Sequence, residues 1–574
     1  MLSYGFKKLT LATLIALFLN HSPSFSCTTL LVTKGASKTG SMIIAHTDDD
    51  DLGDQRIVYV PAQDHPKGSK RSITPLPLLY PRYVGTERGP GYALLKNHPP
   101  TPVSGSIDQV EHTYAYFDAN YAILNEHGLA IGETTCASKF QYKSNDKMIF
   151  DIAELSRIAL ERCKTAREAV LLIGGLAEKY GYFDWGELLI LADNNEGWVF
   201  EISASPKAES ALWVAKKVPD GEVFISANIF RIREVLRDDP DMLYSSNLFA
   251  VAEEEKWIKD GKLDWLPSVS PGEYNHPYYS LRRVWRAQTL FNPSLNLSPW
   301  VENGYTNVYP FSIKPEKKLT TRDVAACLRD YYQETPFDLS KGLAAGPFGC
   351  PYRYTGPYEP AVNTETPNPP PPIGAWERPI SIYYCGYSYI TELRPWLPPA
   401  IGAVTWISLD QPLTSCYIPF YAGVNDLPQG FQTGSTGTFS RKSPWWAFNS
   451  ISNIAAFKFS YMIEDIKKKQ SEIEENELKK QPELEQKAAK LFQKNPKAAK
   501  DLLTSYCNKN ADAVVKKWWD LATYLFEKYT DGYVNKPKVY EEVGYPRSWL
   551  DQVGYKDGPL SYEKPPTTPD PLQD

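Results

Sequence analysis

Short runs of apolar and β-branched residues, separated by turn-forming segments, dominate the chain after residue 26. We expect a β-hairpin that begins at Cys27, because the runs TTLLVT and SMIIAHT flank the turn-rich segment KGASKTG. Four more runs follow further along: ELLILAD, GWVFEIS, ALWVAKKV and EVFISAN, broken by NNEG and PDG. This spacing predicts consecutive strands of one antiparallel meander.

Two helices are predicted ahead of those four strands. The segment IFDIAELSRIALERC repeats apolar residues at helical spacing. The next segment, TAREAVLLIGGLAEKYG, starts with Thr165 and has Glu168 three residues later, which is a capping-box pattern, and Gly181 follows as a stop signal. Strands, two helices and then strands again indicate a layered α+β fold.

The C-terminal part of the chain has a different pattern. A proline run, Pro369–Pro372, predicts an extended surface segment, and strand-like runs resume after it. From about Ile463 the sequence becomes charged and helix-favouring, and ADAVVKKWWDLATYLFEKY carries an apolar stripe that should pack on a core. We therefore expect a main domain over 27–460 and a helical extension over 461–574, packed on that domain.

The first 26 residues have the composition of a secretory signal peptide. Two lysines precede the apolar run Leu9–Leu19, and small residues stand at Ser24 and Ser26. A bilayer span needs about 20 apolar residues, so this run is too short for a permanent anchor. Cleavage after Ser26 would make Cys27 the first residue of an exported protein, periplasmic or extracellular, with no stable membrane insertion.

A lipoprotein also begins with a cysteine, and this is the alternative interpretation of the leader. Lipidation usually requires leucine and small residues just before the cysteine, whereas this chain has Phe25 at the second position back. The motif therefore favours a free Cys27 over a lipid anchor.

The composition indicates a globular protein and argues against some partners and metal sites. The 574 residues are 42% hydrophobic and 23% charged, which suits a large globular core, and the net charge of −6 argues against a nucleic-acid partner. The eight cysteines are scattered singly without a CxxC pair, which disfavours a structural zinc site and leaves disulfide pairing open.

Familiar catalytic and ligand-binding motifs are not found. The segment GASKTGSM lacks the lysine of a phosphate loop, and neither a GxSxG elbow nor an HExxH helix occurs. The acidic run Asp48–Asp51 lacks the alternating ligands and the glycine of a calcium loop. We expect neither a cofactor nor a metal.

Cys27 combines a removable leader with chemistry that needs a free N-terminus. An α-amino group titrates near ~7.7–8.0, so it can accept the thiol proton and act as the general base of its own residue. While the leader is attached, the same nitrogen is an amide without that basicity. The alternative is that Cys27 is a buried structural cysteine.

Several blocks, in the right order, make the chain resemble the cysteine dipeptidases of the dipeptidase A and secernin type, within the N-terminal-nucleophile hydrolases. They are CTTLLVTKGASKTGSMIIAHTDDD, AILNEHGLAIGETT, NNEGWVFEIS with the strands that follow it, YYSLRRVWRA, ERPISIYY and SCYIPFYAG. The resemblance covers most of the chain after the leader. It implies a four-layer αββα sandwich, here with additional C-terminal helices, and amide cleavage through a thioester on Cys27.

The resemblance also assigns residues near the first hairpin. Cys27 matches the nucleophile, and Asp49 matches the acid that holds the α-amine, with Asp48 as its rival. Many relatives have an arginine where this chain has His46, which leaves the charge at that position open. The segment GETT, around Thr134, is a candidate source of a second oxyanion donor.

The resemblance implies two further site residues, both far from Cys27 in the sequence. Asn228 in ISANIFRI matches the asparagine that orients the nucleophile's surroundings and the oxyanion; its alternative role is a turn cap. Arg283 in SLRRVWR matches a site arginine, with Arg282 and Arg286 as register alternatives and a solvated helix face as the other interpretation.

These observations predict an exported, cofactor-free cysteine dipeptidase that acts on small peptides, with its oligomeric state left open. One rival is an acylase that cuts penicillin-like or conjugated bile acid amides. Another is a non-enzymatic surface binding protein, exported or lipid-anchored. A dipeptide carries an ammonium beside the scissile bond, so we expect an acid of the Asp48–Asp51 run, with Asp50 or Asp51 as candidates, to recognise it.

Overall fold

The computed structural model describes residues 27–50, 53–75, 84–85, 88–94, 100–140, 148–207, 210–273, 279–300, 309–354 and 376–555. The expected leader over 1–26, Asp51 and the proline run Pro369–Pro372 lie outside these residues. So do the last residues of the expected helical extension, from 556 onward.

Two large antiparallel sheets organise the described residues. The order of the first is β19 (Ser312–Ile313), β14 (Val223–Ser226), β1 (Thr28–Val32), β2 (Met42–Asp48), β20 (Tyr387–Leu393), β21 (Ala403–Leu409) and β22 (Ile418–Tyr421). The order of the second is β16 (Met242–Tyr244), β13 (Ala211–Lys217), β12 (Gly197–Ala204), β11 (Gly186–Ala192), β10 (Ala130–Cys136), β9 (Leu124–Asn125), β8 (Tyr116–Asp118) and β3 (Val58–Val60).

The hairpin predicted at Cys27 is confirmed, and its register decides where its side chains point. β1 and β2 pair with Thr29 opposite His46, and His46 in turn lies opposite Tyr389 of β20. The Tyr389 hydroxyl donates to the carbonyl of Ile131 on β10, so this side of β2 faces the second sheet. Because side chains alternate along a strand, Asp48 lies on the same inner side as His46.

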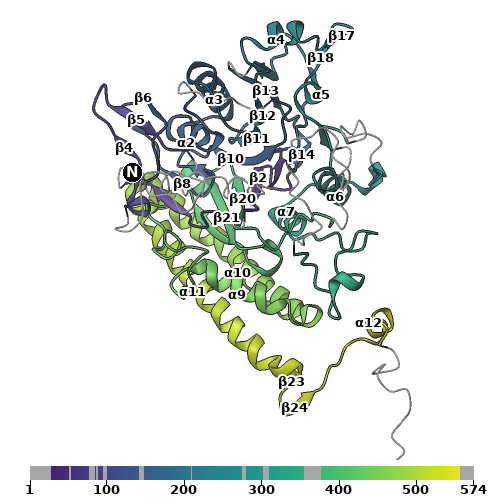
Figure 1. Cartoon of the computed structure of the whole chain (residues 1–574). Coiled ribbons are helices and arrows are strands. Elements are labelled where there is room, and N and C mark those ends of the chain that lie inside the picture. Colours follow the sequence, from purple (N-terminus) through teal and green to yellow (C-terminus); the bar gives the residue numbers. More distant parts are fainter. Residues whose placement is uncertain are drawn as a thin grey trace, which may run out of the picture.

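Helices cover the sheets on opposite sides (Figure 1). Next to the second sheet lie α2 (Ile152–Arg162) and α3 (Ala166–Tyr180). On the first sheet pack α6 (Leu281–Phe291), α7 (Thr321–Leu328), α9 (Pro444–Ala455) and α11 (Pro496–Lys528), with α10 (Phe459–Lys494) against α11. The α+β class predicted from the order of elements is therefore correct.

The predicted start and stop signals of α3 are confirmed. The Thr165 side chain accepts from the backbone of Glu168 at 3.2 Å, and the Glu168 carboxylate accepts from the Thr165 backbone, which completes the predicted capping box. Gly181 ends α3 with φ 78°, a left-handed value that glycine adopts without a steric penalty.

One prediction about the strands was wrong. The run EVFISAN, expected as the fourth strand of a meander, leaves that sheet: β11, β12 and β13 pair in succession, but β14 pairs with β1, Thr29 opposite Ser226. The cause is the turn before β14, which is fastened to the end of β1. The Thr33 hydroxyl donates to the Glu222 carbonyl at 2.8 Å and accepts from the Gly221 amide at 2.9 Å.

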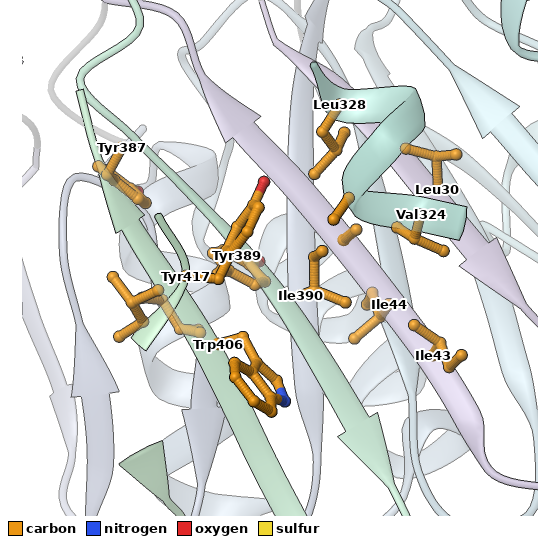
Figure 2. Close-up of a cluster of buried hydrophobic side chains, with 14 of the residues drawn as sticks. Leu30, Ile43, Ile44, Val324, Leu328, Tyr387, Tyr389, Ile390, Trp406 and Tyr417 are labelled. Carbon is orange, nitrogen blue, oxygen red and sulfur yellow. The ribbon is translucent and has the colours of Figure 1, made fainter. Parts of the chain in front are cut away.

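An apolar cluster joins the first sheet to α7, one of the helices that cover it. Figure 2 shows α7 lying across the strands, with Val324 and Leu328 in the same cluster as Leu30 of β1 and Ile390 of β20. All four side chains are fully buried. This packing holds the hairpin that starts at Cys27 on a rigid support.

The C-terminal helices α10 and α11 pack on each other, and α11 also contacts β22. The predicted apolar stripe of α11 is buried at Val514, Trp518, Leu521 and Leu525. The position of the domain boundary near residue 460 stays a prediction. No described helix combines the length and the apolarity that a bilayer crossing requires.

The remaining α-helices and strands are short. They are β4 (Gln63–Asp64), β5 (Lys70–Ile73), β6 (Gly105–Asp108), β7 (His112–Thr113), β15 (Glu234–Val235), β17 (Ile258–Lys259), β18 (Lys262–Asp264), β23 (Val534–Lys536), β24 (Val539–Glu541), α4 (Leu248–Glu254), α5 (Trp265–Val269), α8 (Pro399–Gly402) and α12 (Arg547–Gln552).

Candidate active site

Cys27 lies immediately before β1, buried between the sheets, with 1% of its surface exposed. Its backbone nitrogen donates to Asn228 Oδ1 at 3.1 Å, although 201 positions separate the two residues. Asn228 follows β14 and has φ 58°, a left-handed conformation that asparagine tolerates better than most residues. The pairing of β14 with β1 is what brings this side chain to Cys27.

Arg283 on α6 fixes both groups. Its Nη2 donates to Asn228 Oδ1 at 2.7 Å, and its Nη1 donates to the Cys27 carbonyl at 2.8 Å. The Asn228 amide nitrogen donates in the other direction, to the Thr135 carbonyl at 2.7 Å. These contacts orient the Asn228 oxygen toward the nitrogen of Cys27.

The register alternatives for the site arginine lie elsewhere. Arg282 lies 3.8 Å from Glu377, and Arg286 forms an ion pair with Asp330 at 2.7 Å. Of the three arginines singled out in SLRRVWR, the described structure gives only Arg283 a hydrogen bond to Cys27.

Asp49 is linked to the start of β1 through the Thr47 hydroxyl. Its Oδ2 accepts from the Thr47 hydroxyl at 3.1 Å and from Arg378 Nη2 at 2.7 Å. The same Thr47 hydroxyl accepts from the backbone amide of Thr28 at 3.0 Å. Asp49 is thus neutralised by Arg378 and braces the residue next to Cys27, while its role as holder of the α-amine stays a prediction.

Asp48, the rival of Asp49, lies closer to the thiol. The Cys27 Sγ is 4.0 Å from Asp48 Oδ1, within reach of a weak S–H donor. The same Oδ1 accepts from the Asn120 amide at 3.4 Å. Asp49 follows the end of β2, and the two acids have different hydrogen-bond partners.

Glu133 and His46 also lie near the thiol, and Glu133 carried no predicted role. Glu133 comes from β10 in the GETT segment, and its Oε1 accepts from the Thr135 hydroxyl at 3.0 Å. Its Oε2 lies 3.9 Å from His46 Nε2. The His46 ring packs edge-on against Tyr389, with centroids 5.5 Å apart. The sequence predicts a threonine donor in GETT, and this segment is the signal that points to the neighbourhood of Glu133.

Burial controls protonation at this site. It raises the pKa of the Cys27 thiol well above its usual value, and the charges of Glu133 and Asp48 add to the effect. It also raises the pKa of Glu133 to about 7 and lowers that of His46 to about 3, so the imidazole is neutral near pH 7. The resting thiol is therefore protonated near pH 7.

The same atoms have the composition of a cation site. Ligand atoms of Cys27, His46 and Asp48 lie within 4.8 Å of one another, and they form one such group within the residues that the structure describes. A thiolate, an imidazole and a carboxylate are ligands that zinc accepts. The alternative interpretation is that Cys27 is a nucleophile, surrounded by acids and a neutral imidazole, and that the group binds no metal.

Comparison with known proteins decides the family. The profile of Peptidase family C69 matches residues 26–472. The chain belongs to this family. The matched range contains Cys27, Asn228 and Arg283, which hydrogen bonds join in the structure.

Relatives in this peptidase family carry related names. A probable dipeptidase of Salmonella dublin is 26% identical over 72% of this chain and 84% of its own length. A probable dipeptidase A of Streptococcus pyogenes serotype M1 is 24% identical over 73% of this chain and 80% of its own. A dipeptidase of Bifidobacterium longum is 24% identical over 73% and 75%.

A solved structure with a partial likeness is penicillin V acylase from Agrobacterium tumefaciens. It is 12% identical, with a TM-score of 0.30, over 69% of this chain and 86% of that one.

Proposed function

We propose that this peptidase is an exported cysteine dipeptidase whose leader is removed after Ser26, leaving Cys27 as a free N-terminal nucleophile. The observation that carries the proposal is the hydrogen bond between the Cys27 nitrogen and Asn228 Oδ1, with Arg283 on both residues. Membership in family C69 and the names of its relatives support the dipeptidase activity.

The α-amine of mature Cys27 supplies the base that the protonated thiol needs. As the thiol attacks the scissile carbonyl carbon, its proton passes to the neutral α-amine of the same residue. The amine then protonates the leaving amino group as the C–N bond breaks, which leaves a thioester on Cys27. A water molecule, deprotonated by the same amine, attacks the thioester carbon; the C–S bond breaks, the acid product leaves, and the Cys27 thiolate takes the proton back from the amine.

Asn228 and Arg283 act as positioning residues in this scheme. The Asn228 oxygen accepts from the α-amine and keeps its lone pair directed toward the thiol side. The Arg283 guanidinium holds the Cys27 carbonyl and the Thr28 hydroxyl, at 2.8 and 3.1 Å. Fixing a nucleophile and its base before substrate arrives lowers the entropy cost of attack.

Two finer features belong to the same proposal. The arrangement of two facing sheets with helices on both outer sides supports a four-layer αββα sandwich of the N-terminal-nucleophile type. The leader composition supports export to the periplasm or the extracellular medium.

The test compares two forms of the protein against a panel of dipeptides. One form starts at Cys27, and the other keeps a non-cleavable extension ahead of it. We expect turnover from the first form only, together with a mass increase on Cys27 that matches the acyl group of the substrate. Equal turnover by a stably extended form would rule out the α-amine as base, and preference for penicillin-type amides would replace the dipeptidase by an acylase.

A further inference from the structure

Two buried acids beside Cys27 have no lysine or arginine partner among the described residues. Asp48 and Glu133 are each 1% exposed, and neither forms an ion pair with an arginine or lysine there. The third acid, Asp49, is matched by Arg378 at 2.7 Å. His46 stays neutral near pH 7 and adds no positive charge. A buried carboxylate without a cation is costly, so this region favours a cationic ligand.

The two acids also have oxygens available for such a ligand. Asp48 Oδ2 and Glu133 Oε2 are buried and have no hydrogen-bond partner in the described structure. The other oxygen of each acid is used, by Asn120 and by Thr135 respectively. Buried acceptors are usually paired, and a primary ammonium brings three donors.

The short distance between Asp48 and the Cys27 sulfur indicates which substrate ammonium can bind there. In a dipeptide, the α-ammonium is attached to the carbon next to the scissile carbonyl, so it travels with the carbon that Sγ attacks. Reacting atoms approach to about 3–3.5 Å before attack. Asp48 Oδ1 lies 4.0 Å from Sγ, so this carboxylate is within contact range of a group held that close to the scissile bond.

We propose that Asp48 and Glu133 form the subsite for the free α-ammonium of the substrate's N-terminal residue. The inference rests on the proposed function and sharpens its substrate class: dipeptides with an unmodified amino end are selected, whereas amides that are acylated at that nitrogen are not. It moves the recognising acid from Asp50 or Asp51, the candidates suggested by the sequence, to Asp48 and to Glu133 of another strand.

The Cys27 α-amine does not fill the same role. To act as base it must be neutral, and its nitrogen already donates toward Asn228 Oδ1. The substrate ammonium is therefore the cation that compensates the two acids during the reaction.

The kinetic test uses alanyl-alanine and propionyl-alanine, which differ in the ammonium and little in shape. We expect mature wild-type protein to prefer alanyl-alanine in kcat/KM by at least about tenfold, equivalent to about 1.4 kcal/mol. Asp48→Asn and Glu133→Gln should each shrink this ratio by lowering the value for alanyl-alanine alone. Equal losses for both compounds would overturn the subsite, because the acids would then act on the nucleophile.

A matched control is available in the same sheet. Glu201 on β12 is also fully buried, but its carboxylate accepts from two backbone amides and from the Trp265 indole. Glu201→Gln removes a buried acid away from the thiol, and we expect it to leave the substrate ratio unchanged. A ratio that fell equally in this variant would indicate a general effect of buried charge and would overturn the assignment.

Binding without turnover separates this inference from the proposed function. In mature Cys27→Ala protein, calorimetry should show at least tenfold tighter binding of alanyl-alanine than of propionyl-alanine, and adding Asp48→Asn should remove the difference. If the protein hydrolyses dipeptides but shows no such difference in binding, the proposed subsite is wrong and the proposed function stands. If binding is selective but the wild type is inactive, the proposed hydrolysis is wrong and the subsite stands. One tightly bound metal per chain, required for activity, would overturn the subsite by giving the acids another cation.

Discussion

Two groups of fully buried acids in this protein differ in how their charge is balanced. Asp48 and Glu133, the site acids, have no arginine or lysine partner in the described structure. On α2, by contrast, Glu154 is held by Arg71 at 2.6 Å and by Arg88 at 2.9 Å. We call this second group, together with Glu161, Arg157 and Asp118, the α2 ion network.

The consequences for protonation are opposite. Burial alone would raise the pKa of Glu154, but the charges of the surrounding arginines outweigh it and hold that pKa well below its usual value. For Glu133, no arginine opposes burial; hydrogen bonds with Glu187, Thr135 and Cys27 lower the pKa only in part, and burial raises it to about 7. Compensated acids link α2 to neighbouring strands, whereas acids without an arginine or lysine partner beside Cys27 are suited to the cationic ligand that we propose.

The largest expected effect separates function from stability at the site. Cys27→Ala in the mature protein should reduce kcat/KM by more than about a thousandfold, because the nucleophile is removed, while thermal unfolding stays close to that of the wild type. The control is Cys327→Ala in α7, which empties a small core volume at a cost of about 1 kcal/mol. It should keep its activity. Wild-type rates in Cys27→Ala would eliminate Cys27 as nucleophile.

In the α2 ion network, we expect a substitution to lower stability and to leave activity nearly unchanged. Arg71→Met leaves Glu161 without its bidentate partner and should lower the free energy of unfolding by about 3 kcal/mol in urea titrations. Activity per folded molecule should stay within about twofold of the wild type. Lys70→Met, which breaks an exposed pair with Asp108, is the neighbouring control and should change nothing measurable.

A strong loss of activity per folded molecule in Arg71→Met would contradict the separation of the two groups. It would mean that the α2 ion network also sets the geometry at Cys27.

The smallest expected effect concerns pH. Glu133 has its pKa raised from 4.5 to about 7, so its contribution to stability is full below about pH 4.5 and is lost as the pH rises through 7. Between pH 5 and pH 8, the wild type should therefore lose on the order of 1–3 kcal/mol more than Glu133→Gln. Urea titrations of both proteins at the two pH values measure this difference. Parallel pH profiles would show that Glu133 is compensated after all.

Much of the local structure followed from the sequence. The hairpin after Cys27, the capping box between Thr165 and Glu168, and the stop at Gly181 all depend on residues close together in the chain. Such signals reflect side-chain period and backbone conformation, which neighbouring residues determine. The resemblance to known dipeptidases added Asn228 and Arg283, and the fold does bring both to Cys27.

Other features depended on pairings that the sequence does not display. The run EVFISAN reads as one more strand of a meander, but Thr33 binds the turn before it, so β14 joins β1 and carries Asn228 to the site. The sequence alone determined that a strand starts directly after Cys27. Only the tertiary structure decided that Glu133 lies beside it uncompensated, because the charge balance of a buried acid depends on residues far away in the chain that fold against it.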